Sequence, residues 1–285
     1  MGRNSIKRGM KRARRADTGD AADFLKKNRQ YWEDPNTISL LDKNLRRLEE
    51  AFVLSHLRPE QVLADIGCGD AVSTVRYAKR VRSCTAIEQS GYLRSRAVRR
   101  ILRSRLKNTR CENGTVLDLS GYGASFDVVV TQRVLINLPD WSHQREAIRQ
   151  IHATLRPGGT YLMIENTYEG HELLNRTRRA VGLKDIPIHW HNVFFHHDRL
   201  MAYLRRLFTV ERHHTFDVYY LLTRVFGNLF VPFEGFGRHA SKDPLFDVID
   251  KAAANLFEKA GQEMKLGGAY AFGPIQGFVL RKRPA

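Results

Sequence analysis

The chain has 285 residues, of which 42% are hydrophobic, a length and composition typical of a soluble globular protein with one full core. No apolar run approaches the roughly 20 residues of a membrane-spanning helix, and no apolar stretch follows the basic N-terminus as it would in a secretory signal. Cys68, Cys84 and Cys111 lack the paired spacing of a metal site or a disulfide framework. We therefore expect a cytoplasmic protein.

Positive charge is the unusual feature of the composition. Lys and Arg number 47 against 30 Asp and Glu, which gives a net charge of +17. The segments Arg3–Arg15 and Arg94–Arg110 contribute heavily, and such a field attracts polyanions such as RNA, anionic lipids or acidic glycans. The second segment interleaves Leu93, Ala97 and Ile101 with its arginines, which predicts a packed helix. Its basic outer face is either a polyanion footprint or simply solvated.

Two segments precede the first predicted strand. Residues 1–20 are polar and basic without periodic apolar positions, which predicts a disordered basic tail. Residues 21–57 carry apolar residues at helical spacing and are expected to form an N-terminal helical cap. Tyr31–Thr37 is predicted to interrupt this cap as a loop, with Asn36 or Thr37 capping the next helix.

A buried strand that runs into a tight glycine turn is the most informative feature of the sequence. The apolar run Val62–Ile66 ends at Gly67-Cys68-Gly69, and helix-compatible sequence follows. Such a turn lets backbone N–H groups approach a ligand closely at a helix N-terminus. Glu88 ends the next apolar stretch, 21 residues after Gly67, where an acid can bind both hydroxyls of a ribose. Together they predict a nucleoside pocket on a parallel sheet.

The turn departs from the dinucleotide fingerprint. The third glycine of G-x-G-x-x-G is Val72 here. Asp65 before the turn and Asp70 inside it add negative charge, which suits a cationic ligand better than a pyrophosphate.

The remaining elements alternate between strands and helices up to residue 165, which predicts a parallel α/β sheet. We expect strands at Cys84–Glu88, Phe126–Thr131, Tyr161–Glu165, Phe208–Asp217 and Gly277–Lys282, and helices at Arg94–Arg105, Trp141–Leu155, Leu200–Leu207 and about Pro244–Ala260. Residues 58–285 would then form one domain with substrate-side insertions at about 166–205 and 224–273.

With these motifs in order, the chain resembles the class I S-adenosylmethionine-dependent methyltransferases. Their first motif, roughly D-x-G-C-G-x-G, matches Asp65 to Ala71, with Ala71 in place of the third glycine, and their turn L-[KR]-P-G-G matches Leu155 to Gly159. The resemblance implies a Rossmann-like seven-stranded sheet with helices on both faces, an N-terminal helical lid and an insertion before the last strand. It also implies S-adenosylmethionine as cofactor, with S-adenosylhomocysteine as product. The cofactor residues it implies are Asp65, Gly67, Cys68, Gly69, Glu88, Gln89, Leu117, Asp118 and Gln132.

A second resemblance covers most of the chain outside the basic tail. Thr37 to Arg46, Trp190 to Phe195 and Tyr219 to Val225 are similar to stretches of uncharacterised class I members found among surface-polysaccharide biosynthesis genes. A glycan or small-molecule acceptor is expected from the cofactor motifs, the insertion after the fifth strand and the loop that holds Trp190 and His191.

Acceptors in open α/β sheets lie beyond the carboxyl ends of the strands, which directs attention to the residues just after the fourth and fifth strands. We predict His191 as general base or acceptor-orienting group, with Arg133 and Glu165 in catalytic positions. The alternative for His191 is a loop histidine bonded to backbone. Predicted substrate-binding residues are Tyr31, Asn137, Arg178, Trp190 and Asn192, with Arg133 and Arg178 as candidates to bind an anionic acceptor.

Four histidines in nine residues, His189, His191, His196 and His197, raise the question of a metal. Metal-dependent methyltransferases of the catechol type use mainly carboxylates and an amide, and the sequence offers no such cluster. We expect no functional metal.

The sequence therefore predicts a methyltransferase acting on a small-molecule or glycan acceptor, with transfer to oxygen. The alternatives are an RNA methyltransferase that uses the basic surface, and methylation of a nitrogen or carboxyl group of a small metabolite. Against RNA, the position after the fourth strand reads Thr131-Gln132-Arg133-Val134 rather than an amino-methylation motif. We expect a monomer or a homodimer; nucleic acid is not the favoured partner.

Overall fold

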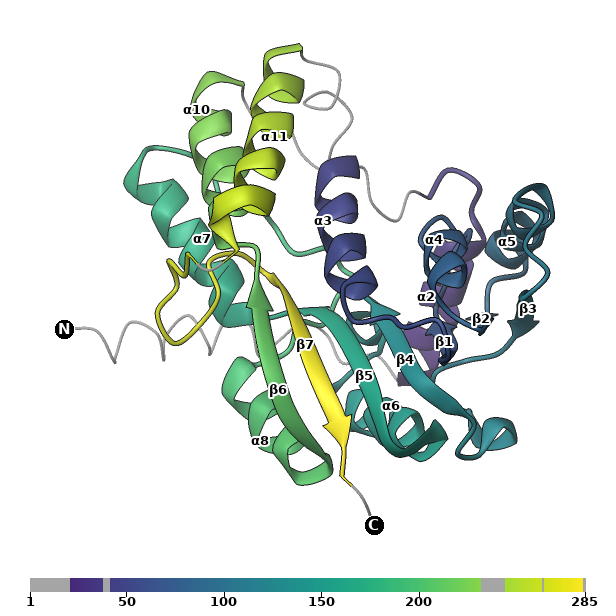
Figure 1. Cartoon of the computed structure of the whole chain (residues 1–285). Helices are drawn as coiled ribbons and strands as arrows, with labels where there is room; N and C mark the ends of the chain where they lie inside the picture. The colour runs from purple at the N-terminus through teal and green to yellow at the C-terminus, as the bar shows by residue number, and fades with distance from the viewer. Residues whose placement is uncertain (1–20, 38–41, 232–243, 263, 284–285) are drawn as a thin grey trace.

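The computed structural model describes residues 21–37, 42–231, 244–262 and 264–283. The basic tail, Ile38 to Leu41 and the Pro232–Asp243 part of the predicted insertion lie outside them. The described residues form a seven-stranded sheet in the order β3-β2-β1-β4-β5-β7-β6 (Figure 1). The strands are β1 Val62–Ile66, β2 Ser83–Glu88, β3 Thr109–Asn113, β4 Phe126–Gln132, β5 Leu155–Asn166, β6 Phe208–Thr215 and β7 Ile275–Lys282.

The sheet is parallel except for one strand. Each neighbouring pair from β3 to β5 runs parallel, while β7 inserts antiparallel between β5 and β6. The two strands predicted at Phe208–Asp217 and Gly277–Lys282 thus pair with each other, and the predicted seven-stranded α/β class is confirmed.

Alternating strand residues form two separate cores, one on each face of the sheet. Leu63, Val130 and Leu162 pack with α3, α7, α9 and α11, whereas Ala64 and Met163 pack with α6 and α8. This alternation follows from the two-residue period of a strand and explains why both faces are covered by helices. The helices are α2 Ala21–Glu33, α3 Lys43–Leu54, α4 Thr74–Tyr77, α5 Gly91–Arg103, α6 Trp141–Thr154, α7 Tyr168–Ala180, α8 His197–Leu207, α9 Asp217–Tyr220, α10 Gly227–Phe230 and α11 Pro244–Leu256.

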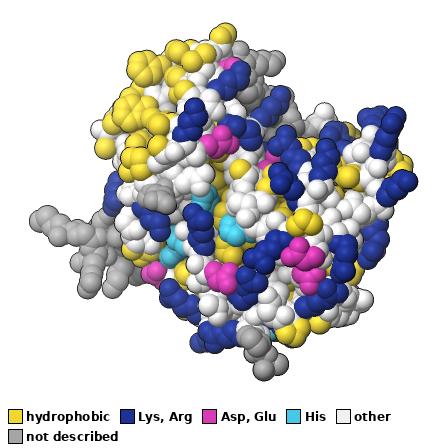
Figure 2. Space-filling view, viewed as in Figure 1, with side chains coloured by type: hydrophobic (Ala, Val, Ile, Leu, Met, Phe, Trp, Pro, Cys, Tyr) yellow, Lys and Arg dark blue, Asp and Glu magenta, His cyan; other side chains and the backbone are white. Residues whose placement is uncertain are grey.

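Shorter turns complete the architecture. The segments η2 Ala78–Arg80, η3 Ser120–Tyr122 and η4 Leu135–Asn137 are 3-10 turns, and η5 Leu221–Phe226 and η7 Phe257–Gly261 are π-helical. Exposed apolar side chains gather over α10 and α11, and Lys and Arg side chains are spread over the same view of the molecule (Figure 2). None of the described helices combines the length and apolar character needed to cross a membrane.

Several local predictions need correction. Tyr31 and Trp32 form the last turn of α2 rather than a loop, and α3 is capped by Asp42, whose side chain accepts from the Leu45 N–H, rather than by Asn36 or Thr37. The Leu155–Gly159 turn lies within β5, which begins at Leu155.

The insertions also differ from their predicted form. The helix α7 occupies the start of the 166–205 insertion, where no helix was predicted. In the second insertion, α11 and η7 together span Pro244–Gly261, as predicted at about Pro244–Ala260, whereas the α9–η5–α10 segment begins seven residues before position 224. The strand β6 ends at Thr215 rather than Asp217.

Candidate functional site

A cavity of about 1330 Å³ runs along the carboxyl ends of the parallel strands. Its walls come from the end of β1, the glycine turn, the ends of β2, β4 and β5, and the loop that holds His191. The helix α2 lines one side through Leu25, Asn28 and Tyr31. Residues far apart in sequence thus converge where ligands bind in open α/β sheets.

The glycine turn is shaped by close packing and left-handed backbone. Gly67 has φ of 68° and Gly69 has φ of 58°. A Cβ on Gly67 would lie 2.6 Å from Cγ2 of Val134, whereas one on Gly69 would meet nothing within 4 Å. Gly67 is therefore required by packing, and Gly69 leaves open space beside a cavity that a ligand can approach.

Two buried acids flank this turn. The Glu88 carboxylate accepts hydrogen bonds from the N–H groups of Gly69 and Ser90, both at 2.9 Å. The Asp65 carboxylate accepts from Oγ1 of Thr74 at 2.6 Å. Burial raises the pKa of both groups, that of Asp65 to about 7. Two carboxyl groups thus lie beside the turn, where their oxygens can accept hydrogen bonds from ribose hydroxyls or face a cationic ligand.

Of the two residues predicted after the third strand, only one faces the cavity. Leu117 lines it, together with Val116. Asp118 is exposed and turned to Ser120, whose Oγ donates to it at 2.8 Å, and this bond lowers the pKa of the carboxyl. The structure therefore does not bring Asp118 to the predicted cofactor site. The local hydrogen bond to Ser120 takes the place of a bond between Asp118 and a ligand in the cavity.

The other predicted cofactor residues lie on the cavity wall. Cys68, Gln89 and Gln132 all contribute to it. Gln132 accepts from the Tyr77 hydroxyl at 2.8 Å, so its side chain is held in one orientation. The glycine turn, the acids Asp65 and Glu88 and the apolar Leu117 thus line the same cavity.

Arg133 and Glu165 are both bonded to other groups of the protein around the turn after β4, and of the two only Arg133 lines the cavity. Arg133 has φ of 56° and forms an ion pair with the buried Glu49 of α3. Glu165 lies outside the cavity wall and accepts from the N–H groups of Val134 and Leu135 at 3.0 and 2.9 Å. We assign Glu165 to supporting the backbone that carries Asn137.

The His191 loop forms an aromatic cluster with the end of α2. The His191 ring stacks on Tyr31 with ring centroids 4.4 Å apart and meets Trp32 edge-on at 5.7 Å. Burial and the neighbouring His189 lower the pKa of His191 to about 4, so the ring is neutral at pH 7. Asn192 also lines the cavity, whereas Trp190 is 54% exposed, outside the cavity wall, and packs on Tyr31 and Phe24.

Arg178 is a structural cation. It lies outside the cavity wall and donates to the Lys184 carbonyl at 2.8 Å and to Oδ1 of Asn228 at 2.7 Å. These bonds join α7 to α10. The prediction that Arg178 binds substrate is therefore not supported by its position.

Several polar atoms that make no hydrogen bond lie along the cavity. Among the described residues, six side chains hold a buried polar atom that makes no hydrogen bond, and all six line the cavity. Buried polar groups are normally satisfied, so these atoms point to a ligand. They are Asn28 Nδ2, Asn137 Oδ1, Asn166 Oδ1, His171 Nδ1, His191 Nδ1 and Arg224 Nη1.

Sequence reasoning did not assign a role to Asn28, His171 or Arg224. Asn28 sits in a polar helix, and His171 in a helix that was not predicted. Arg224 falls within the Tyr219–Val225 stretch that carried a resemblance, which was the one available signal. Among the residues described, no group of three or more metal-ligating side chains is assembled.

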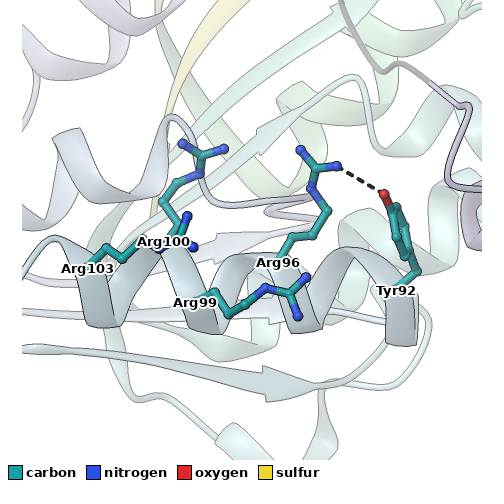
Figure 3. Close-up of a pocket in the computed structure, with 5 residues that line it drawn as sticks. All are labelled: Tyr92, Arg96, Arg99, Arg100 and Arg103. Carbon is teal, nitrogen blue, oxygen red and sulfur yellow. Dashed lines mark hydrogen bonds between the residues drawn. The ribbon is translucent and has the colours of Figure 1, made fainter.

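A second hollow, of about 340 Å³, lies on the outer face of α5. Tyr92, Arg96, Arg99, Arg100 and Arg103 line it (Figure 3). Arg96 donates to the Tyr92 hydroxyl at 3.0 Å, and Arg100 forms an ion pair with Asp70 at 2.8 Å. We call these five residues the arginine face.

Comparisons with known proteins agree with this site. A family described as "Methyltransferase domain" matches residues 63–159. No curated protein matches the sequence.

Solved structures share the fold at low identity. The N-methyltransferase NodS of Bradyrhizobium japonicum, solved with S-adenosylhomocysteine, is 16% identical with a TM-score of 0.54, over 91% of this chain and 98% of that one. Geranyl diphosphate methyltransferase is 11% identical with a TM-score of 0.54, over 83% and 77%. The [4+2]-cyclase SpnF is 19% identical with a TM-score of 0.53, over 84% and 81%. At these identities the likeness shows the fold alone.

Residues 63–159 match a methyltransferase domain, and the strand order of the whole sheet is the fold shared with solved methyltransferases. These findings support an S-adenosylmethionine-dependent methyltransferase.

Proposed function

We propose that the protein transfers a methyl group from S-adenosylmethionine to an oxygen of a small-molecule or glycan acceptor. When bound, the cofactor supplies an electrophilic methyl group on a sulfonium sulfur. The observation that carries the proposal is the extent of the cavity. It continues from the glycine turn past β4 and β5 to Tyr220 and Arg224, leaving room beside the cofactor for an acceptor.

The proposed cofactor residues share the β1–β4 edge of the cavity. We assign the ribose to Glu88, the methionine end to the glycine turn and the adenine to the apolar wall around Leu117. The complete set is Asp65, Gly67, Cys68, Gly69, Glu88, Gln89, Leu117 and Gln132. S-adenosylhomocysteine would leave from the same edge.

On the acceptor side we propose His191 as general base or orienting group. Its ring is neutral, buried and stacked, and its Nδ1 has no partner among the described residues. A neutral imidazole can take the proton of an acceptor hydroxyl as the methyl group is transferred. Tyr31, Asn137 and Asn192 would position that acceptor.

The domain boundaries belong to the same proposal. Residues 21–57 would act as a cap over the cofactor, and residues 58–285 as the methyltransferase domain with its substrate-side insertions. The resemblance of the Trp190–Phe195 stretch to proteins of surface-polysaccharide loci supports a glycan acceptor. We propose a monomer or homodimer.

A second candidate, an RNA methyltransferase, is favoured by the arginine face. A hollow lined by four arginines offers bidentate contacts to phosphates. Two of these arginines contact Asp70, which reduces the charge available to a polyanion. Methylation of a nitrogen or carboxyl group of a metabolite is the third candidate, because the cavity itself does not select the accepting atom.

Transfer of labelled methyl into an extract from cells lacking this gene tests the proposal. The extract is divided into nuclease-treated and untreated halves before the protein and labelled S-adenosylmethionine are added. Nuclease-resistant label in a glycan or small-metabolite fraction is the expected result. Label that disappears with nuclease would instead make the arginine face the substrate footprint.

A further inference from the structure

The acceptor half of the cavity carries its own set of fixed polar groups. Asn137, Asn166, His171 and Arg224 come from η4, β5, α7 and η5, and all four line the cavity. Each holds a buried polar atom that makes no hydrogen bond among the described residues. Leaving such an atom unpaired is costly, so these four atoms indicate what this part of the cavity binds.

The orientation of the His171 ring defines one of these groups. The Asn175 amide exchanges two hydrogen bonds with the backbone of Ile186, accepting at 2.9 Å and donating at 3.0 Å. Its nitrogen is therefore a donor, and it lies 3.2 Å from Nε2 of His171. Nε2 must accept, so the proton of the neutral ring sits on Nδ1, the atom without a partner. His171 thus presents an N–H donor to the cavity.

Asn137 presents the opposite polarity. Its Nδ2 donates to the Arg133 carbonyl at 2.7 Å, which fixes the amide and leaves Oδ1 as an acceptor without a partner. Asn166 also has its Oδ1 unsatisfied. Donors and acceptors therefore face the same space, and hydroxyl groups are the ligand atoms that both donate and accept.

Two cationic side chains in this part of the cavity are already paired with acids of the protein. The buried Arg224 forms an ion pair with Asp42, and Arg133 forms one with Glu49. An anionic ligand would find these cations already matched, and it would meet the acceptor oxygen of Asn137. Lys26 and Lys43 also line the cavity, and both are exposed.

We propose that the acceptor pocket recognises an uncharged, hydroxyl-rich group of the kind a neutral sugar ring offers. In this pocket His171 is a positioning residue whose tautomer is set by Asn175. The inference rests on the proposed function, because it takes the β4–β5 half of the cavity as the acceptor side. It revises the earlier expectation that Arg133 and Arg178 bind an anionic acceptor.

The test uses the full chain saturated with S-adenosylhomocysteine. Ligand-observed NMR titrations compare neutral methyl hexosides in the gluco, manno and galacto series with the matching hexuronates and hexose 6-phosphates. We expect at least one neutral sugar to bind about tenfold more tightly than its charged partners. Equal or tighter binding of the charged partners, or no neutral sugar bound in any series, would overturn the inference.

Two variants test the role of His171. His171→Asn places an amide nitrogen near the position of Nδ1 and should retain sugar binding, whereas His171→Leu should weaken it about tenfold. A two-bond ¹H–¹⁵N spectrum should show the proton on Nδ1 in the wild-type protein and a changed tautomer balance in Asn175→Leu. A proton on Nε2 in the wild type, or equal sugar affinity in both His171 variants, would contradict the assignment.

Calorimetric titration of S-adenosylhomocysteine separates this inference from the proposed function. Both His171 variants should bind it as the wild type does. Absence of cofactor binding in the wild type would refute the proposed function, whereas cofactor binding without any preference for neutral sugars would refute only the acceptor inference.

Discussion

Glu88 is the residue whose placement bears most directly on cofactor binding. Its carboxylate is buried at the cavity wall and bonded to the Gly69 N–H. Glu88→Ala should weaken S-adenosylmethionine binding by about 1–3 kcal/mol through the loss of a charge-assisted hydrogen bond. Isothermal titration calorimetry measures the change.

Glu112 provides the matched control for this substitution. It is an acid on the neighbouring strand β3 and lies outside the cavity wall, bonded to the Tyr122 hydroxyl. Glu112→Ala should leave the cofactor affinity unchanged. Equal losses in the two variants would mean that Glu88 acts only through stability.

Ala71 replaces a glycine of the related motif but should not restrict the cofactor. It has φ of 60°, is fully buried and packs with Ala97 and Ile101 of α5, outside the cavity wall. Its methyl group therefore points away from the methionine end of the site. Ala71→Gly should leave the affinity for S-adenosylmethionine within about twofold, since no cofactor contact changes. A large gain in affinity on calorimetry would place the methyl group in the site.

His191 links the proposed base to a pH profile. Because burial lowers the pKa of His191 to about 4, the ring stays neutral through the physiological range. If His191 is the base, the rate of methyl transfer should therefore not fall near pH 6.5 on the acid side of the pH profile. His191→Ala should depress turnover while sparing cofactor affinity. Wild-type rates in this variant, or an acid limb near pH 6.5 that disappears with it, would contradict the account.

The relative positions of the glycine turn and Glu88 could be predicted from the sequence. The glycine turn and Glu88 lie next to each other because adjacent parallel strands end at the same edge. Arg178 and Glu165 could not be placed from sequence, because their partners, Asn228 and the Val134–Leu135 backbone, are distant in the chain.

At the scale of elements, the end of α2 is held by the start of α5. Glu33 at the end of α2 accepts from the N–H groups of Gly91 and Tyr92, at the start of α5, at 2.7 and 2.9 Å. Oγ of Ser90 also donates to the Trp32 carbonyl at 3.0 Å. Of these two anchoring residues, Trp32 lines the cavity and Glu33 does not.

Glu33→Ala should therefore loosen α2 without removing a cavity residue. Loss of a capping interaction worth about 1 kcal/mol should raise the dissociation constant of S-adenosylmethionine several-fold, chiefly through faster release. Stopped-flow release of the cofactor measures this rate. An unchanged release rate would show that α2 does not cover the cofactor.

The arginine face separates the two macromolecular interpretations. Arg96 and Arg100 contact Asp70, whereas Arg99 and Arg103 make no ion pair within the described residues. The double substitution Arg99→Ala/Arg103→Ala should weaken the binding of single-stranded RNA. The slope of the logarithm of the binding constant against the logarithm of the salt concentration should become about 1.4 less steep, since two phosphate contacts are lost. Filter binding at several salt concentrations measures the slope.

Under the proposed function, the same double variant keeps full methyl transfer to the nuclease-resistant acceptor. Loss of that transfer would favour the RNA interpretation.

Element prediction failed where tertiary contacts set the boundary. α7 begins with Tyr168, whose N–H donates to the Phe195 carbonyl, a contact no local pattern reveals. The periodic apolar residues of the 21–57 segment predicted a helix. The residue that caps α3, Asp42, is also bonded to Arg224 and Tyr219, which lie far away in the chain.

At the scale of the whole molecule, buried acids couple stability to pH. Burial raises the pKa of Glu165 from 4.5 to about 7, against the opposing bonds from the Leu135 and Val134 N–H groups. The folded state therefore holds a proton that the unfolded state releases. The corresponding stability, about 3 kcal/mol, is complete below pH 4.5 and is lost as pH rises to about 7.

Glu165→Gln should remove this contribution to the pH dependence. Urea unfolding between pH 4.5 and 8 should show a steeper fall in the free energy of unfolding for the wild type than for the variant. Asp65 titrates in both proteins and cancels in the comparison. Parallel profiles would contradict the assigned pKa.

The overall architecture followed from sequence because strand periodicity, turn glycines and strand spacing agree with one sheet. The acceptor pocket did not follow, since it is assembled from η4, β5, α7 and η5, which span about ninety residues.

The central claim is that S-adenosylmethionine lies along the carboxyl edge of β1, β2 and β4 beneath α2. Hydrogen exchange with and without S-adenosylhomocysteine tests it most directly. We predict slower exchange in the Gly67–Asp70 turn, after Glu88, at Gly114–Leu117 and in α2, with no change in β6 or α8. Absence of protection in the glycine turn, or protection confined to the outer face of α5, would contradict the account.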